Sequence, residues 1–221
     1  MTDLDAPTPV VAVDNDIVLK ASCYGASSIL WPGNPMSESI VVLGQARFVV
    51  AKRLGRMALV GSVEDALAER ELVLGRAEVL EPSEAEITLA AYIEARATEA
   101  SHGLDSGESQ LAALVVSRGF SLLQTGDKRA IRGLEALLDV ISDLMALVGR
   151  VMCLEQLVYA AVSRGSLDDL REPICRERDV DTALSMCFAC HSPNPSVDDV
   201  QEGLDSYVTD LRRDATRVLA S

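Results

Sequence analysis

The stretch of residues 104–132 constrains the fold most, because it places a short apolar run between two helical patterns. It reads LDSGESQLAALVVSRGFSLLQTGDKRAIR, which predicts a helix, a turn, a strand at residues 121–124 and a second helix. Glu108 falls in the first turn of the first helix, and Asp127 falls just past the strand. In an α/β sheet the carboxyl ends of the strands and the nearby helix N-termini face one crevice. Two carboxylates delivered there make an oxygen-rich site of the kind that holds Mg²⁺ or Mn²⁺.

A third acid lies far upstream, at the end of another apolar run. Asp14 follows VVAV at residues 10–13, which is apolar at every position and therefore suits a central strand covered on both faces. Asp16 is expected as the N-cap of the helix that follows, and it is also a candidate metal ligand. We predict that Asp14, Glu108 and Asp127 come together in space.

These strings resemble the PIN-like nuclease superfamily over roughly residues 9–135. The resemblance rests on a strand ending in Asp, a D-x-G-E helix start, and a strand running into Asp-Lys-Arg. It implies a three-layer α/β/α domain with a small parallel sheet and one or two Mg²⁺ or Mn²⁺ ions. The implied activity is hydrolysis of phosphodiester bonds, usually of RNA, with Asp14, Glu108 and Asp127 as the matching acids.

The family normally carries a further acid in the middle, on a helix after its second strand. Here that region reads ARFVVAKRLGR, with Lys52 and Arg53 where an acid would fall, so this acid is not placed. Basic residues gather beside the last acid instead, and Lys128 or Arg129 could hold a substrate phosphate. Thr125 could bond a metal-bound water.

Each acid also has a purely structural interpretation. Asp-Ser-Gly-Glu at residues 105–108 is a capping-box variant, in which Asp105 accepts from a backbone N–H and Glu108 bonds back. The functional interpretation, which we favour, makes Asp105 the cap and leaves Glu108 free as the ligand. Asp127 fits the N-cap of the next helix, and Asp14 fits a strand-end turn.

The charge is the feature least favourable to a nuclease. A formal net charge of −14 gives a field that repels polyanions, whereas proteins that bind nucleic acid usually carry a basic surface. The basic residues must therefore gather on one face, or long nucleic acid is not the ligand. The sequence shows no secretory signal and no stretch of membrane-spanning length, so we expect a cytoplasmic protein without membrane contact.

The remainder of the chain predicts mostly helix. Residues 40–54 could be a helix entering a strand at 47–50, and Ser83 with Glu86 makes a capping box for a helix over residues 84–98. No strand is expected after about residue 131. We therefore divide the chain into a PIN-like domain at residues 1–135 and an all-helical extension at residues 136–221. An exposed amphipathic helix in this extension would favour a homodimer or a docked protein partner.

The five cysteines are odd in number and irregularly spaced, which indicates mostly reduced thiols in a reducing compartment. The pattern Cys187-x-x-Cys190-His191 leaves covalent haem attachment, a zinc site and buried apolar packing open, and packing is favoured.

Two functions follow. The first is a metal-dependent PIN-like ribonuclease. The alternative is a catalytically weak or inactive PIN-like module that acts through its helical extension, as one half of a toxin–antitoxin or defence pair or as a subunit.

Overall fold

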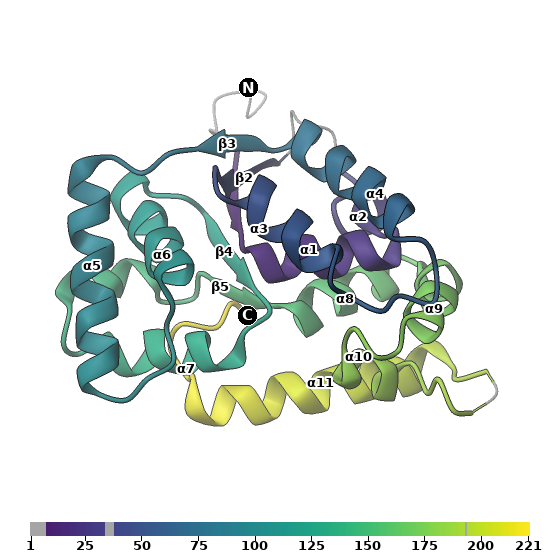
Figure 1. The fold of residues 1–221 in the computed structure, drawn as a ribbon. Helices are drawn as coiled ribbons and strands as arrows, with labels where there is room; N and C mark the ends of the chain where they lie inside the picture. The colour runs from purple at the N-terminus through teal and green to yellow at the C-terminus, as the bar shows by residue number, and fades with distance from the viewer. Residues whose placement is uncertain (1–7, 34–37, 193) are drawn as a thin grey trace, which may run out of the picture.

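The computed structural model describes residues 8–33, 38–192 and 194–221, and it has an α/β fold around a five-stranded parallel sheet (Figure 1). The strands are β1 (Val10–Val13), β2 (Ser39–Leu43), β3 (Glu78–Leu80), β4 (Leu122–Thr125) and β5 (Val151–Cys153). Their order in the sheet is β3-β2-β1-β4-β5, so β1 lies at the centre. The expected α/β class with a small central parallel sheet is confirmed.

Helices cover both faces of this sheet (Figure 1). They are α1 (Asn15–Tyr24), α2 (Ser27–Leu30), α3 (Ala46–Leu54), α4 (Val63–Arg76), α5 (Glu84–Glu99), α6 (Ser106–Arg118), α7 (Lys128–Leu137), the 3₁₀ helix η1 (Ser142–Leu147), α8 (Leu154–Ser163), α9 (Leu167–Arg176), α10 (Thr182–Cys187) and α11 (Val197–Asp214). Figure 1 shows α5, α6 and α7 on one side of the sheet and α1, α3 and α4 on the other.

The core consists of two apolar clusters, one on each face. Alternation along β1 explains the division, because Val11 and Val13 pack into one cluster and Ala12 packs into the other. All three side chains are buried, as expected for a strand covered on both faces.

Two sequence predictions about strands are wrong. In residues 40–54 the strand comes first and the helix second, since β2 ends at Leu43 and α3 begins at Ala46. A strand also exists beyond residue 131: β5 pairs in parallel with β4. The region expected to be all-helical therefore supplies one edge of the sheet, and residues from both expected parts fill each apolar cluster.

The C-terminal segment, residues 217–220, is hydrogen-bonded to β5 at this edge of the sheet and to α7. Val151 N donates to Val218 O at 2.9 Å, and Ala220 N donates to Val151 O at 2.8 Å. The Arg217 guanidinium donates to buried Glu135 on α7, with Nε 2.7 Å from Oε1. Burial alone would raise the pKa of Glu135, but the hydrogen bonds from Arg217 and Val218 hold it below its ordinary value.

Helix α11 covers its own apolar stripe within the molecule. Val200, Leu204, Val208 and Leu211 are buried, and α11 contacts α8 and α10. The exposed amphipathic helix that would have favoured a homodimer or a docked partner is therefore not found in α11. Among the described residues, none of the helices combines the length and the apolar character needed to cross a bilayer.

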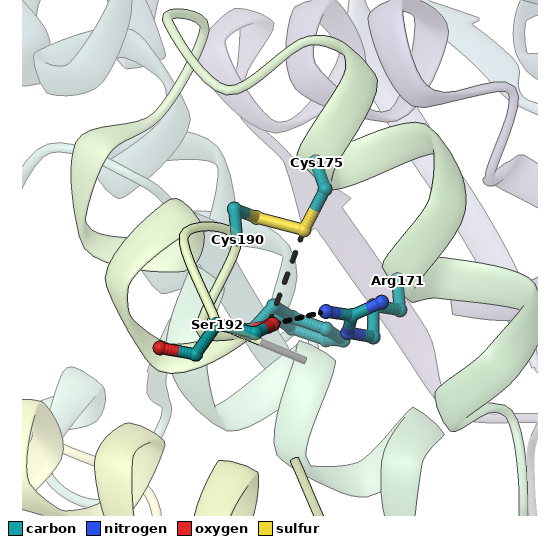
Figure 2. Close-up of a disulfide and its surroundings, with 5 residues drawn as sticks. Arg171, Cys175, Cys190 and Ser192 are labelled. Atoms are coloured by element: carbon teal, nitrogen blue, oxygen red, sulfur yellow. Dashed lines mark hydrogen bonds between the residues drawn. A yellow bond between two sulfur atoms is a disulfide. The ribbon is translucent and has the colours of Figure 1, made fainter. Parts of the chain in front are cut away.

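The cysteines differ from expectation. Cys175 on α9 forms a disulfide with Cys190, in the turn after α10, because the two segments bring their Cα atoms to 5.0 Å (Figure 2). In the same turn, Arg171 Nη2 donates to Ser192 O at 2.9 Å. Cys187 is buried, as expected, whereas Cys190 is bonded and unavailable for haem or zinc. Disulfides are rare in cytosolic proteins, so this bond gives no support to the cytoplasmic prediction.

Candidate functional site

The candidate site lies at the carboxyl ends of the two central strands. Asp14 follows β1 directly, and its backbone N donates to Gln124 O of β4 at 2.9 Å. Gly126 and Asp127 follow β4 directly. Because β1 and β4 run parallel and adjacent, Asp14 and Asp127 emerge at the same edge of the sheet.

The structure brings the three predicted acids to one pocket of about 450 Å³. The described residues that line it come from the ends of β1 and β4 and from α1, α3, α6 and α7: Asp14, Asn15, Asp16, Lys20, Val49, Arg53, Asp105, Glu108, Gly126, Asp127 and Arg129. The convergence of Asp14, Glu108 and Asp127 is therefore confirmed. Their catalytic and metal-binding roles stay predictions.

All three acids also cap helices. Asp14 is the N-cap of α1, and its Oδ1 accepts from Asn15 N at 2.7 Å. Asp127 is the N-cap of α7, and its Oδ1 accepts from Arg129 N at 2.8 Å. The expectation that Asp16 caps α1 is wrong, because Asp14 holds that position. Asp16 lies in the first turn of α1, lines the pocket and does not cap the helix.

Glu108 serves two purposes at once. It closes a capping box with Asp105, since Glu108 Oε2 accepts from Asp105 N and Asp105 Oδ1 accepts from Glu108 N, each at 2.9 Å. The prediction that capping leaves Glu108 free is therefore wrong for one of its two oxygens. A single glutamate closes the helix start and lines the pocket.

Side-chain cations neutralise part of the pocket. Asp16 is bridged by Lys20 at 2.7 Å and by Arg53 at 3.1 Å. Asp127 is held by Arg129, whose Nη2 lies 2.7 Å from Oδ2. Burial alone would raise the pKa of Asp127, but the hydrogen bonds from Arg129 outweigh it and keep the pKa below its ordinary value.

Asp14 and Glu108 are buried and have no cationic partner within the part of the chain that the structure describes. Burial, followed by repulsion from Asp16, raises the pKa of Asp14 to about 6. Burial also raises the pKa of Glu108 to about 8, helped by the negative charges of Asp105, Asp14 and Asp127 and opposed by the hydrogen bond from Asp105 N. These two carboxyls are where an added cation would relieve most repulsion.

The three residues predicted to contact phosphate are placed differently from one another. Arg129 lines the pocket and is exposed. Thr125 is buried behind Asp14, with its Oγ1 3.2 Å from Asp14 Oδ2, so it supports the acid. The structure does not bring Lys128 to the pocket. Its Nζ lies 2.5 Å from Oε1 of buried Glu155 and 4.5 Å from the centre of the Tyr207 ring.

Sequence reasoning missed Lys20 and the role of α3. Lys20 lies one turn after Asp16, and this i, i+4 spacing is a signal for an ion pair. Lys20 also bridges to Asp181 before α10 at 2.7 Å, a contact that no local pattern indicates. Helix α3 contributes Val49 and Arg53 to the pocket and contains no acid.

The acids of the pocket can be compared with the ligand set that a divalent cation requires. Within residues 8–33, 38–192 and 194–221, no three His, Cys, Asp or Glu side chains are grouped so that they could hold one ion together. Mg²⁺, however, is usually bound through one or two carboxylates plus substrate phosphates, with several waters retained. The carboxyls of Asp14 and Glu108, which have no cationic partner among the described residues, supply hard oxygen ligands of that kind. The residues present therefore fit a cation held jointly by protein and substrate, and they do not form a closed protein cage.

The chain shows little similarity to known proteins. No family model matches the chain, and no curated protein matches it. A search of solved structures finds a chain in the crystal structure of VapBC2 from Rickettsia felis bound to a DNA fragment from their promoter. The two chains are 10% identical with a TM-score of 0.43, and the match covers 64% of this chain and 96% of that one.

Proposed function

We propose that this protein is a PIN-like, divalent-cation-dependent phosphodiesterase that cleaves RNA. The observation that carries the proposal is the meeting of Asp14, Glu108 and Asp127, from three separate parts of the chain, on one pocket at the carboxyl edge of a parallel sheet. Ligands of open α/β sheets bind at this edge. The PIN-like motifs in the sequence favour phosphodiester hydrolysis over other reactions at such a pocket.

Asp14 and Glu108 would hold Mg²⁺ or Mn²⁺ jointly with a substrate phosphate, and Asp127 and Asp16 would contact the waters that the cation retains. The cation would supply a nucleophilic water at neutral pH and stabilise charge on the leaving oxygen. Loading requires the proton of Glu108 to leave, because the raised pKa keeps this carboxyl largely protonated near pH 7. We therefore expect cation affinity to rise with pH up to about pH 8.

The chain's own residues position the reacting groups. Thr125 Oγ1 donates to Asp14 Oδ2 and orients this carboxylate toward the pocket. Arg129 is exposed at the mouth and pairs only with Asp127 among the described acids. A substrate phosphate could take the guanidinium from Asp127, which would free Oδ2 of Asp127 as the substrate enters, while Oδ1 stays in the cap of α7.

The direct test is cleavage of short RNA and DNA oligonucleotides with Mn²⁺ or Mg²⁺, comparing the protein with its Asp127→Asn variant. Asparagine keeps the N-cap of α7, so the variant should fold while losing the charge. Asp143→Asn in η1 is the matched control, because Asp143 is exposed and outside the pocket. We expect cleavage by the protein and by the control, and loss of cleavage in Asp127→Asn. Equal cleavage by all three would exclude the assignment.

One observation favours a second candidate, an inactive PIN-like interaction module. Lys20 and Arg53 already neutralise Asp16, so side-chain cations supply part of the positive charge that a metal ion would bring. Such a module would be one half of a toxin–antitoxin or defence pair, or a subunit. Thermal melting separates the two candidates, because a functional site should melt higher with Mn²⁺ and an inactive one should show no shift.

A further inference from the structure

The basic residues of this acidic protein include one concentrated group, on and just after α3. Between Glu38 and Glu64 the chain contains no Asp or Glu, although it has 34 of them in total. The same interval carries four basic residues, which are Arg47, Lys52, Arg53 and Arg56. All four are exposed. We call the exposed residues Arg47, Phe48, Lys52 and Arg56 the α3 ridge.

The ridge stands directly beside the candidate site. One side of α3 is buried through Ala46, Val50 and Leu54. Val49 and Arg53 line the acidic pocket. Arg47 and Phe48 line a second hollow of about 630 Å³ between α3 and α4, together with Arg70, Glu71, Leu74 and Gly75. Figure 1 shows α3 at the surface beside α1 and α4.

The stability of the fold explains only some of these side chains. Cations in the last turn of a helix favour the helix dipole, which accounts for Lys52 and Arg53. The same dipole disfavours Arg47, because it lies in the first turn. Phe48 is 77% exposed, so burial does not account for it either. Within the described residues, Arg47, Lys52 and Arg56 have no acidic partner, whereas Arg53 pairs with Asp16.

We propose that the α3 ridge binds single-stranded nucleic acid and leads it into the acidic pocket. Arg47, Lys52 and Arg56 contact successive phosphates, and Phe48 stacks on a base between them. Exposed aromatic rings interleaved with cations suit unpaired bases, which offer a stacking face that a duplex hides. The direction toward the pocket rests on the proposed function, whereas the binding itself does not. The net charge of −14 would repel a polyanion, but the ridge concentrates positive charge where the strand would lie.

Binding is measured by fluorescence anisotropy of end-labelled single-stranded RNA and DNA in EDTA, so that no cleavage occurs. The triple variant Arg47→Ala, Lys52→Ala, Arg56→Ala should bind more weakly. Its slope of log affinity against log salt should fall in magnitude by about 2, at about 0.7 per lost phosphate contact. Phe48→Ala should weaken binding by about five- to hundredfold, the loss of one stacked base.

Matched controls separate the ridge from charge and aromaticity in general. Tyr92→Ala on α5 removes another exposed aromatic ring, and Arg178→Ala with Arg213→Ala removes exposed cations elsewhere. These controls should bind like the parent. Absence of binding by the parent chain, or parent-like binding by Phe48→Ala and by the triple variant, would overturn the proposal. Equal competition by poly-glutamate would also overturn it, because the surface would then recognise an acidic protein or any polyanion.

Two experimental outcomes distinguish nucleic-acid binding by the α3 ridge from phosphodiesterase activity at the pocket. Binding in EDTA that depends on the ridge, without cleavage when Mn²⁺ is added, keeps the ridge and rejects the phosphodiesterase. Cleavage that is unchanged in Phe48→Ala and in the triple variant keeps the phosphodiesterase and rejects the ridge.

Discussion

The Glu108→Gln variant gives the sharpest test of how the pocket is charged. Glutamine is isosteric and neutral, and its amide oxygen can still accept the hydrogen bond from Asp105 N, so the capping box is retained. The substitution therefore removes the ionisable proton and little else. Any change in stability reports on the ionisation of Glu108.

Burial raises the pKa of Glu108 from 4.5 to about 8, which corresponds to about 5 kcal/mol without screening. Glu108 borders an open, solvent-filled pocket, and solvent screening reduces the usable figure to about 2 kcal/mol. The sign follows from the direction of the shift. The folded state favours the protonated carboxyl, so this contribution is fully present below pH 4.5 and is lost as the pH rises to about 8.

We therefore expect Glu108→Gln to match the parent near pH 4 and to exceed it by about 2 kcal/mol near pH 8. Denaturant unfolding can be followed by the fluorescence of buried Trp31, the only tryptophan in the chain. Saturating Mn²⁺ should remove the difference, because a cation stabilises the ionised parent and not the amide. A difference that does not vary with pH, or a glutamine variant less stable at every pH, would refute the reasoning.

Three further predictions concern other parts of the molecule. Arg53→Glu should raise the affinity for Mn²⁺ at least several-fold by calorimetry, because it removes one of the two cations that pair with Asp16 and adds an acid on α3; unchanged affinity would count against a cation bound between Asp16 and α3. Reduction of the Cys175–Cys190 disulfide, which closes a loop with a sequence separation of 15, should cost about 3 kcal/mol in urea unfolding, and an unshifted midpoint would contradict this. Hydrogen bonds from the C-terminal segment outweigh burial and keep the pKa of Glu135 low, so the protein should lose stability as the pH falls below 4.5. This loss should be smaller in Glu135→Gln, which should be less stable than the parent at pH 7, and an equally acid-sensitive variant would exclude Glu135 as a source of the loss.

The sequence was sufficient for the elements whose local signals agree. The capping box of Ser83 and Glu86 starts α5 as expected. The apolar runs that end in Asp14 and near Asp127 became neighbouring strands. The convergence of the acids followed from this adjacency, because parallel neighbours end at the same edge.

The wrong predictions about strands share one physical cause, which is that the elements or the connections between them are short. Strand β5 has three residues and passes directly into α8, so its apolar side chains were absorbed into a helical pattern. Because β5 was not predicted, the ion pair between Lys128 and Glu155, which follows this strand, was not predicted either. Lys128 was therefore assigned to the pocket. In residues 40–54 the strand and the helix are separated only by Gly44 and Gln45, without a proline to mark the break.

The segment at residues 218–220 has one further consequence, because it runs alongside β5 and occupies the outer hydrogen-bonding positions of Val151. A strand that ends a sheet can recruit a strand from another molecule, and this is a common beginning of aggregation. Residues 218–220 therefore protect the edge of β5 from pairing with another molecule. A truncation before Arg217, or a fusion that pulls this segment away, would leave β5 open to intermolecular pairing even with the acidic pocket intact.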